Sequence, residues 1–239
     1  MSIADRLGEI RARIAAAARS AGRDPASVRL VAVSKTFPIE AIAEAAAAGQ
    51  RDFGENRVQE ALQKLEQALQ KLPGSADQSI RWHLLGHLQS NKARKAAAAF
   101  AMIQSVDSVE LIRRLDQAAA ESGRAPELLI QVDLAGEATK FGAPPAEVPR
   151  LLEAAAACRA ARVVGLMTLP PAPEKPEDSR PWFRRLRELR DAWLAAGVPA
   201  AMLRELSMGM SGDFEVAVEE SATIVRVGTA IFGSRHVEH

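Results

Sequence analysis

The chain has 239 residues, and its 31 basic and 30 acidic side chains leave a formal net charge of +1. This balance argues against a surface for polyanions, and the absence of tyrosine, with only seven phenylalanines and three tryptophans, argues against a platform that stacks nucleic-acid bases. The sequence has no apolar stretch of the roughly 18 to 20 residues that a membrane span needs, no signal-peptide core at its N-terminus, and a single cysteine. We therefore expect a cytoplasmic protein.

Strand-like apolar runs alternate with amphipathic helical segments along the chain. A first helix is predicted over residues 3–21. Eight strands are predicted over residues 28–33, 51–53, 81–85, 102–106, 128–134, 163–167, 203–207 and 223–227. Helices are predicted between them over residues 39–48, 57–71, 91–100, 109–122, 146–159, 181–196 and 214–220.

The strict alternation of strands and helices indicates an α/β protein with a parallel sheet. Eight such units fit a closed (β/α)8 TIM barrel better than an open doubly wound sheet. We expect one domain over residues 1–239, because the proline-rich segment 170–176 lies between a strand and its helix and is interpreted as a surface loop. Ligands of such barrels bind at the carboxyl ends of the strands, so the residues at those ends are the candidates for function.

Lys35 ends the first predicted strand, in the segment LVAVSKTFP at residues 30–38. Partial burial at a strand end favours the neutral amine, which is the form that attacks a carbonyl. The alternative is that Lys35 is a solvated surface charge, as most lysines are. Lys140, after the fifth strand, is a rival amine, but its polar surroundings favour an ordinary surface lysine.

Two further strand ends carry polar side chains. Asn56 follows the second strand, where Gly54 permits a tight turn, and its amide either caps the next helix or contacts a ligand. His83 and His87 belong to the third strand and its loop. Their spacing of four aligns metal ligands only on a helix, and no cysteine cluster accompanies them, so no metal site is predicted.

Hydroxyls and glycines follow the last two strands, in the segments SMGMSGD at residues 207–213 and RVGTAIFG at residues 226–233. Loops at this place in such barrels often bind phosphate at the start of a short helix, which Gly228 and Thr229 would provide, and Ser207 adds a hydroxyl. The alternative is that the hydroxyls cap helices and the glycines serve turns. An amine combined with a phosphate site predicts a ligand that carries both a carbonyl and a phosphate: pyridoxal phosphate (PLP) or an aldolase substrate.

The chain resembles the pyridoxal phosphate homeostasis proteins, whose fold is shared with the N-terminal domain of alanine racemases. The resemblance runs almost end to end. It rests on these segments in order: VAVSK at 31–35, FGEN at 53–56, WH at 82–83 with Gly86, LQSNK at 88–92, GLMT at 165–168, LSMGMS at 206–211 and RVGTAIFG at 226–233. The chain departs from the family at Asp133, where asparagine is expected, and at Phe141, where the family often has serine.

The resemblance implies a fold-type III PLP protein in which Lys35 holds the cofactor as a Schiff base. The other cofactor-binding residues that it implies contact the phosphate (Ser207, Gly228 and Thr229), the pyridine nitrogen (Arg226) or the rest of the cofactor (Asn56 and Met208).

The composition favours a carrier over an enzyme. Alanine racemases resemble this fold but use a lysine and a tyrosine as their two bases, whereas this chain has no tyrosine and lacks the length for a second domain. Arg226 beside the ring nitrogen would also weaken the ring as an electron sink, because a guanidinium does not release a proton to it. The expected function is to carry and buffer PLP for vitamin B6 homeostasis and to supply apo-enzymes, as a monomer that binds neither nucleic acid nor membrane.

Three alternatives come from other classes of protein. A slow amino-acid racemase would act through Lys35 alone, and a Schiff-base aldolase would trap a sugar phosphate on Lys35 or Lys140 without a cofactor. An interaction protein would use the helix 181–196, where Trp182, Leu186, Leu189 and Trp193 form one apolar stripe. That spacing is typical of the face with which a barrel helix packs on its strands.

Overall fold

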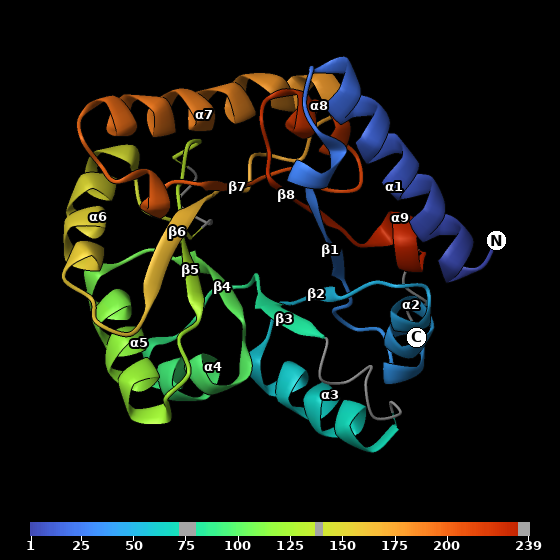
Figure 1. Ribbon diagram of the computed structural model, residues 1–239, viewed down its shortest axis with the longest axis horizontal. Coiled ribbons are helices and arrows are strands. Elements are labelled where there is room, and N and C mark those ends of the chain that lie inside the picture. Colours follow the sequence, from blue (N-terminus) through green and yellow to red (C-terminus); the bar gives the residue numbers. More distant parts are fainter. Residues whose placement is uncertain (72–79, 137–140, 234–239) are drawn as a thin grey trace.

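The computed structural model describes residues 1–71, 80–136 and 141–233. Its parallel strands follow one another in chain order and close into a barrel when β8 pairs with β1 (Figure 1). The strands are β1 (Arg29–Val33), β2 (Asp52–Glu55), β3 (Arg81–Leu84), β4 (Met102–Val106), β5 (Glu127–Gln131), β6 (Arg162–Met167), β7 (Glu205–Ser207) and β8 (Ile224–Val227). The predicted (β/α)8 barrel is confirmed.

The α-helices form a ring outside the barrel (Figure 1). They are α1 (Ile3–Ser20), α2 (Ile39–Ala47), α3 (Val58–Lys71), α4 (Ala93–Ala99), α5 (Val109–Ser122), α6 (Val148–Ala156), α7 (Arg180–Ala195), α8 (Phe214–Glu219) and α9 (Thr229–Phe232). Among the described residues, no helix is both long and apolar enough to cross a membrane.

The second strand extends beyond its prediction, which ended at Phe53. Gly54 belongs to β2 and does not form the expected turn. A Cβ atom at this position would lie 2.6 Å from Leu85 Cδ1 and 3.1 Å from Val31 Cγ1. Glycine here lets two apolar side chains approach the strand closely, and any larger residue would displace the end of the Leu85 side chain.

The fifth strand is shorter than its prediction over residues 128–134. β5 ends at Gln131, and Asp133 Oδ1 accepts hydrogen bonds from the backbone N–H groups of Ala135 and Gly136. An aspartate that bonds to the backbone two and three residues ahead turns the chain. The backbone N–H of Val132 still donates to the carbonyl oxygen of Met167 on β6 at 2.8 Å, but the next N–H group, that of Asp133, donates to Ala143 outside the strands.

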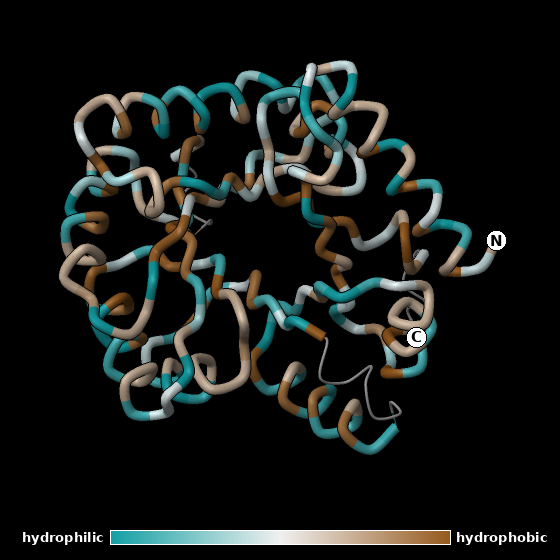
Figure 2. The backbone as a smooth tube through the Cα atoms, viewed as in Figure 1, coloured by the Kyte–Doolittle hydropathy of each residue, from teal (hydrophilic) through white to brown (hydrophobic). Residues whose placement is uncertain are grey.

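Side chains alternate along each strand between the helix layer and the barrel interior. Outward side chains pack with the helices in the main hydrophobic core, and Figure 2 shows hydrophobic and hydrophilic residues alternating along the helices. A smaller apolar cluster of residues from the strands fills part of the interior: Val31, Met102, Leu129, Val164, Met167 and Ile224. Buried polar side chains accompany this cluster, among them His83, Gln104, Ser207 and Arg226.

The stripe predicted on α7 is only partly the packing face. Phe183 and Leu186 are its buried side chains, and Trp193 packs against the core while partly exposed. The arginines of this helix face acidic groups: Arg184 and Arg187 both lie within 3.2 Å of Glu220 carboxylate oxygens. These contacts make the basic side of α7 part of an intramolecular ion-pair network.

Helix α1 covers the seam where the barrel closes, next to α2, α8 and α9 (Figure 1). Its buried residues, which include Ile3, Leu7, Ile10 and Ile14, are spaced three or four apart and so lie on one face. Ser2 and Asp5 form a capping box at its start, which satisfies two backbone N–H groups that the helix leaves free.

Gly165 tests how closely the strands pack. A Cβ atom there would lie 2.0 Å from the carbonyl oxygen of Glu205 on the paired strand, so Gly165→Ala must displace backbone. We expect this substitution to lower the free energy of unfolding by about 3 kcal/mol in urea denaturation. The control is Gly8→Ala, at an exposed position of α1 with no atom within 4 Å, which we expect to stabilise by about 0.5–1 kcal/mol. Equal effects of the two substitutions would contradict the close approach.

Candidate functional site

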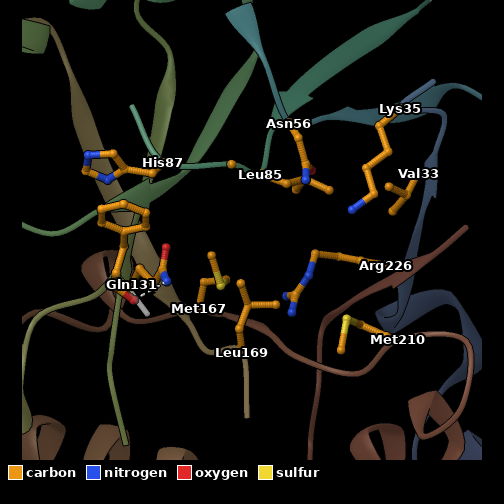
Figure 3. Close-up of a pocket in the computed structure, with 12 residues that line it drawn as sticks. Val33, Lys35, Asn56, Leu85, His87, Gln131, Met167, Leu169, Met210 and Arg226 are labelled. Carbon is orange, nitrogen blue, oxygen red and sulfur yellow. Dashed lines mark hydrogen bonds between the residues drawn. The ribbon is translucent and has the colours of Figure 1, made fainter. Parts of the chain in front are cut away.

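Lys35 lies just beyond β1 and lines a cavity of about 310 Å³ at the carboxyl ends of the strands (Figure 3). The wall of this cavity is mainly apolar, with side chains that include Val33, Leu85, Met167, Leu169 and Met210. A few polar groups interrupt it: Lys35, Asn56, His87, Gln131 and Arg226. A concave apolar site with a small number of polar side chains is typical of a small-molecule pocket.

A buried lysine holds the backbone before Lys35. Lys64 Nζ, on α3, donates to the carbonyl oxygen of Ser34 at 2.8 Å and lies 2.8 Å from Glu55 Oε1. The Ser34 hydroxyl donates to the same Glu55 oxygen at 2.6 Å. Ser34, Glu55 and Lys64 are all buried, so this network ties the end of β1 to β2 and α3.

The backbone after Lys35 is held by a second carboxylate. The N–H group of Thr36 donates to Glu60 Oε1 at 2.6 Å, and the same oxygen lies 2.8 Å from Lys64 Nζ. Thr36 has a φ of 68°, a left-handed conformation that β-branched residues rarely adopt. The surrounding contacts therefore impose the turn that directs Lys35 into the cavity.

Glu55 is the member of this network whose burial costs the most free energy, because its carboxylate is charged and only partly hydrogen-bonded. Burial raises the pKa of its carboxyl, while the hydrogen bonds from Lys64 and Ser34 act in the opposite direction. Within the described part of the chain, its second oxygen, Oε2, is buried and has no hydrogen-bond partner. The negative charge of Glu55 consequently depends on Lys64 for compensation.

Arg226 enters the same cavity from β8, the strand paired with β1, and its side chain and that of Lys35 extend into one space (Figure 3). Its Nη1 donates to Ser207 Oγ at 2.5 Å and its Nη2 to the carbonyl oxygen of Thr168 at 2.9 Å. Burial lowers the pKa of Arg226 to about 10, although Asp213 opposes this shift. The guanidinium is therefore still protonated at neutral pH and acts only as a donor.

The structure assigns Ser207 to a different place from the predicted phosphate contact. Its side chain is fully buried in the barrel interior, where the hydroxyl accepts from Arg226 and donates to Gln104 Oε1 at 2.6 Å. A hydroxyl has one hydrogen, and Gln104 already receives it. In this geometry Ser207 supports Arg226 and has no hydrogen left for a phosphate.

Met208 does not line the cavity as predicted, and Met210 does. Because side chains alternate along an extended chain, Met208 points away from Ser207 and joins the core between strands and helices. In an extended chain Met210 would lie on the same side as Met208, but Gly209 between them has a φ of 90°, so the chain turns and Met210 lines the cavity.

The turn after β8 lies beside the end of β1. A Cβ atom on Gly228 would be 3.2 Å from the carbonyl oxygen of Val33, a cavity residue. The N–H groups of Gly228 and Ala230 donate to Ser211 Oγ at 3.3 and 3.4 Å, and Thr229 begins α9 at an exposed position. The predicted phosphate contacts of Gly228 and Thr229 therefore lie next to the cavity and remain a prediction.

Asn56 lines the cavity, and its side chain points into it (Figure 3). Helix α3 begins at Val58, so the residue that precedes this helix is Arg57 and the alternative interpretation of Asn56 as its cap does not apply. Lys140, the rival amine, lies outside the described residues.

The two histidines of the third unit do not converge. His83 is buried in the barrel and hydrogen-bonded to Asp52, whereas the His87 ring lies at the cavity and stacks on Phe141 at 3.7 Å between ring centroids. No group of three or more metal-ligating side chains occurs among the described residues. Sequence reasoning missed three cavity residues: Gln131, which lies inside the predicted fifth strand, and His87 and Phe141, which follow predicted strands.

Comparison with known proteins identifies the family. The family model for the alanine racemase N-terminal domain matches residues 6–236. The pyridoxal phosphate homeostasis protein of Aquifex aeolicus is 43% identical over 235 residues, which cover 98% of this chain and 99% of that protein. The protein of the same name from Escherichia coli K12 is 41% identical over 98% of this chain and 97% of its own length. The chain belongs to the pyridoxal phosphate homeostasis protein family.

Solved structures agree with this assignment. PipY of Synechococcus elongatus, solved with PLP bound, is 44% identical, with a TM-score of 0.81 over 97% of this chain and 100% of that one. An alanine racemase of Clostridium difficile is 15% identical with a TM-score of 0.67, and the match covers 98% of this chain and 58% of that one. The latter similarity shows a shared fold alone.

The Lys64–Glu55 pair makes a stability prediction. Lys64→Met removes the compensating charge and leaves Glu55 buried, so we expect the free energy of unfolding in urea to fall by about 3 kcal/mol. Lys64→Met combined with Glu55→Gln should cost clearly less than the two single substitutions added together.

The control is Lys71→Met, which breaks the exposed pair with Glu40 and should cost no more than about 0.5 kcal/mol. A cost of Lys64→Met as small as that of the control, or additive costs in the double variant, would show that the buried charges are not coupled.

Proposed function

We propose that this chain binds PLP reversibly at the cavity, with Lys35 as the covalent anchor, and that it carries and buffers the cofactor without a dedicated catalytic turnover. The observation that carries the proposal is the convergence of the Lys35 and Arg226 side chains in one apolar cavity (Figure 3). Membership of the pyridoxal phosphate homeostasis protein family, and the PLP bound to the related PipY structure, support it.

The residues of the cavity fit the cofactor. When bound, PLP supplies an aldehyde that reacts with a neutral amine and a pyridine ring that draws electrons when its nitrogen is protonated. Lys35 provides the amine, and the apolar side chains of Val33, Leu85 and Met167 suit the faces of an aromatic ring. The amide of Asn56 offers polar contacts to the ring substituents.

Arg226 determines the character of the site. Two nitrogens of its guanidinium donate hydrogen bonds to Ser207 and Thr168. Because Arg226 also lines the cavity, we expect its guanidinium to donate to an acceptor atom of the ligand. An unprotonated pyridine nitrogen is such an acceptor. With a pKa of about 10, Arg226 keeps its own proton at neutral pH, so the ring stays without one and remains a poor electron sink.

The chain also lacks the partner that two-base racemisation requires, because it contains no tyrosine. A site that binds an aldehyde covalently, leaves the ring weakly activated and lacks this second base suits storage and transfer. We propose that the phosphate lies at the turn of Gly228 and Thr229, and that apo-enzymes take PLP from a monomeric carrier.

Binding is tested by adding PLP to the purified protein, recording visible absorption, reducing with borohydride and identifying the modified peptide. We expect one pyridoxyl group, on Lys35. Lys35→Ala should abolish the absorption, because no other amine is held in the cavity wall among the described residues. Lys71→Ala, which removes an exposed lysine of α3, is the matched control and should bind PLP as the unchanged protein does.

Three results would contradict parts of the proposal. Pyridoxyl on Lys92 or Lys140 in place of Lys35 would overturn the assignment of the anchor. Protein that takes up no PLP would overturn the binding function. Sustained conversion of L- to D-amino acids by the PLP-loaded protein, lost in Lys35→Ala, would show a racemase and overturn the carrier role.

A further inference from the structure

A chain of buried hydrogen bonds leads from Arg226 through the barrel interior. Ser207 Oγ receives Arg226 Nη1 at 2.5 Å and donates to Gln104 Oε1 at 2.6 Å. Gln104 Nε2 lies 3.1 Å from His83 Nδ1, and His83 Nε2 lies 2.8 Å from Asp52 Oδ1. The five residues come from β8, β7, β4, β3 and β2, and each is at most 5% exposed.

The chemistry of its two ends fixes the direction of every bond. Arg226 can only donate, so Ser207 accepts from it and gives its own hydrogen to the carbonyl oxygen of Gln104. The Gln104 amide nitrogen is thereby turned toward His83 and must donate to Nδ1. The ring hydrogen of His83 then belongs on Nε2, where the Asp52 carboxylate accepts it.

The electrostatic surroundings keep this arrangement. Burial is the largest effect on His83, and it lowers the pKa of the ring despite the hydrogen bond and the charge of Asp52, which raise it. The positive charges of Arg29 and Arg81 add smaller effects in the same direction as burial. Burial alone would raise the pKa of Asp52, but its hydrogen bonds to His83 and Arg81 hold it below the usual value. The ring is neutral and the carboxylate charged at neutral pH.

We propose that Asp52, His83, Gln104 and Ser207 form a positioning chain for Arg226, in which the Nε2–H form of His83 fixes the direction of the guanidinium toward the cavity. None of these four residues lines the cavity, and on the binding mode proposed above none contacts the cofactor; they reach the cavity only through Arg226. The effect of the positioning chain on PLP binding rests on that proposed function, whereas its effect on the orientation of Arg226 does not.

The opposite tautomer of His83 would disrupt the hydrogen bonds that orient Arg226. A hydrogen on Nδ1 would face the NH2 group of Gln104, donor against donor, and Gln104 would have to turn its amide. Its NH2 group would then meet the Ser207 hydroxyl, which would lose its acceptor. Arg226 would be left beside a hydroxyl whose hydrogen has no fixed direction.

The test compares Gln104→Leu with Met102→Leu in the full-length protein without added ligand. Both positions are on β4 and face the interior. Met102 packs in the apolar cluster and meets the positioning chain only through the weak contact of its Sδ with Gln104 Nε2 at 3.6 Å, so Met102→Leu leaves the four bonds of the chain in place. Nitrogen-15 NMR should show His83 neutral at neutral pH, with its hydrogen on Nε2. The guanidinium signal of Arg226, assigned by its loss in Arg226→Lys, should exchange with water about tenfold faster in Gln104→Leu and unchanged in Met102→Leu.

PLP titration gives a second measurement. The loss of one supporting hydrogen bond should weaken binding to Gln104→Leu roughly fivefold, with Lys35 still modified, and Met102→Leu should bind normally. If Gln104→Leu does not fold, His83→Phe replaces it, since a phenyl ring keeps the flat shape but removes the acceptor for Gln104, while Arg81 still pairs with Asp52.

The outcomes separate the two proposals. A hydrogen on His83 Nδ1, or unchanged exchange of the Arg226 guanidinium in Gln104→Leu, overturns the positioning chain even if PLP binds. A protein that binds no PLP overturns the proposed function, and the exchange rates then still decide whether the chain positions Arg226.

Discussion

Burying a charged side chain costs several kcal/mol unless other groups replace the water that it loses. Arg226 carries such a charge at the carboxyl end of β8, and its replacements are the Ser207 hydroxyl and the Thr168 carbonyl. Ser207 can serve only because Gln104 accepts its hydrogen. One buried cation therefore explains why a barrel interior that is otherwise apolar contains a row of polar side chains.

A second buried charge network joins helix α3 to the end of β1. Lys64 and Glu55 are buried behind the end of β1 and determine the path of the backbone on which Lys35 stands. The two networks do not share a residue, yet they set the two ends of the same cavity wall. The position of the amine and the direction of the guanidinium can thus be altered independently by mutation.

The sequence predicts the architecture well where local signals and tertiary packing agree. β4 and α5 have the predicted bounds, and α5 begins after a capping Ser108 and ends before Gly123 with a positive φ. Gly54 is misleading in the sequence because glycine is typical of both turns and close packing. The residues that distinguish the two, Val31 on β1 and Leu85 just after β3, are distant in the sequence.

In the candidate site too, local sequence signals identify some residues, whereas the roles of others depend on residues distant in the sequence. Strand ends indicate Lys35, Asn56 and Arg226, and all three line one cavity. The roles of Ser207 and Met208 depend on which face of β7 each side chain points to. The predicted strand bounds alone do not give this direction. The partner of Ser207, Gln104, is on another strand far away in the chain, so no motif contains the pair.

The pairing of β1 with β8 has a consequence for the order of events in the cell. Lys35 belongs to the first strand unit and Arg226 to the last, so the two come together only when the barrel closes. Contacts this distant in sequence carry a large loop-closure entropy, which slows the formation of folds that depend on them. A chain still being synthesised cannot hold a ligand between these two side chains, and any ligand bound there stabilises only the finished barrel.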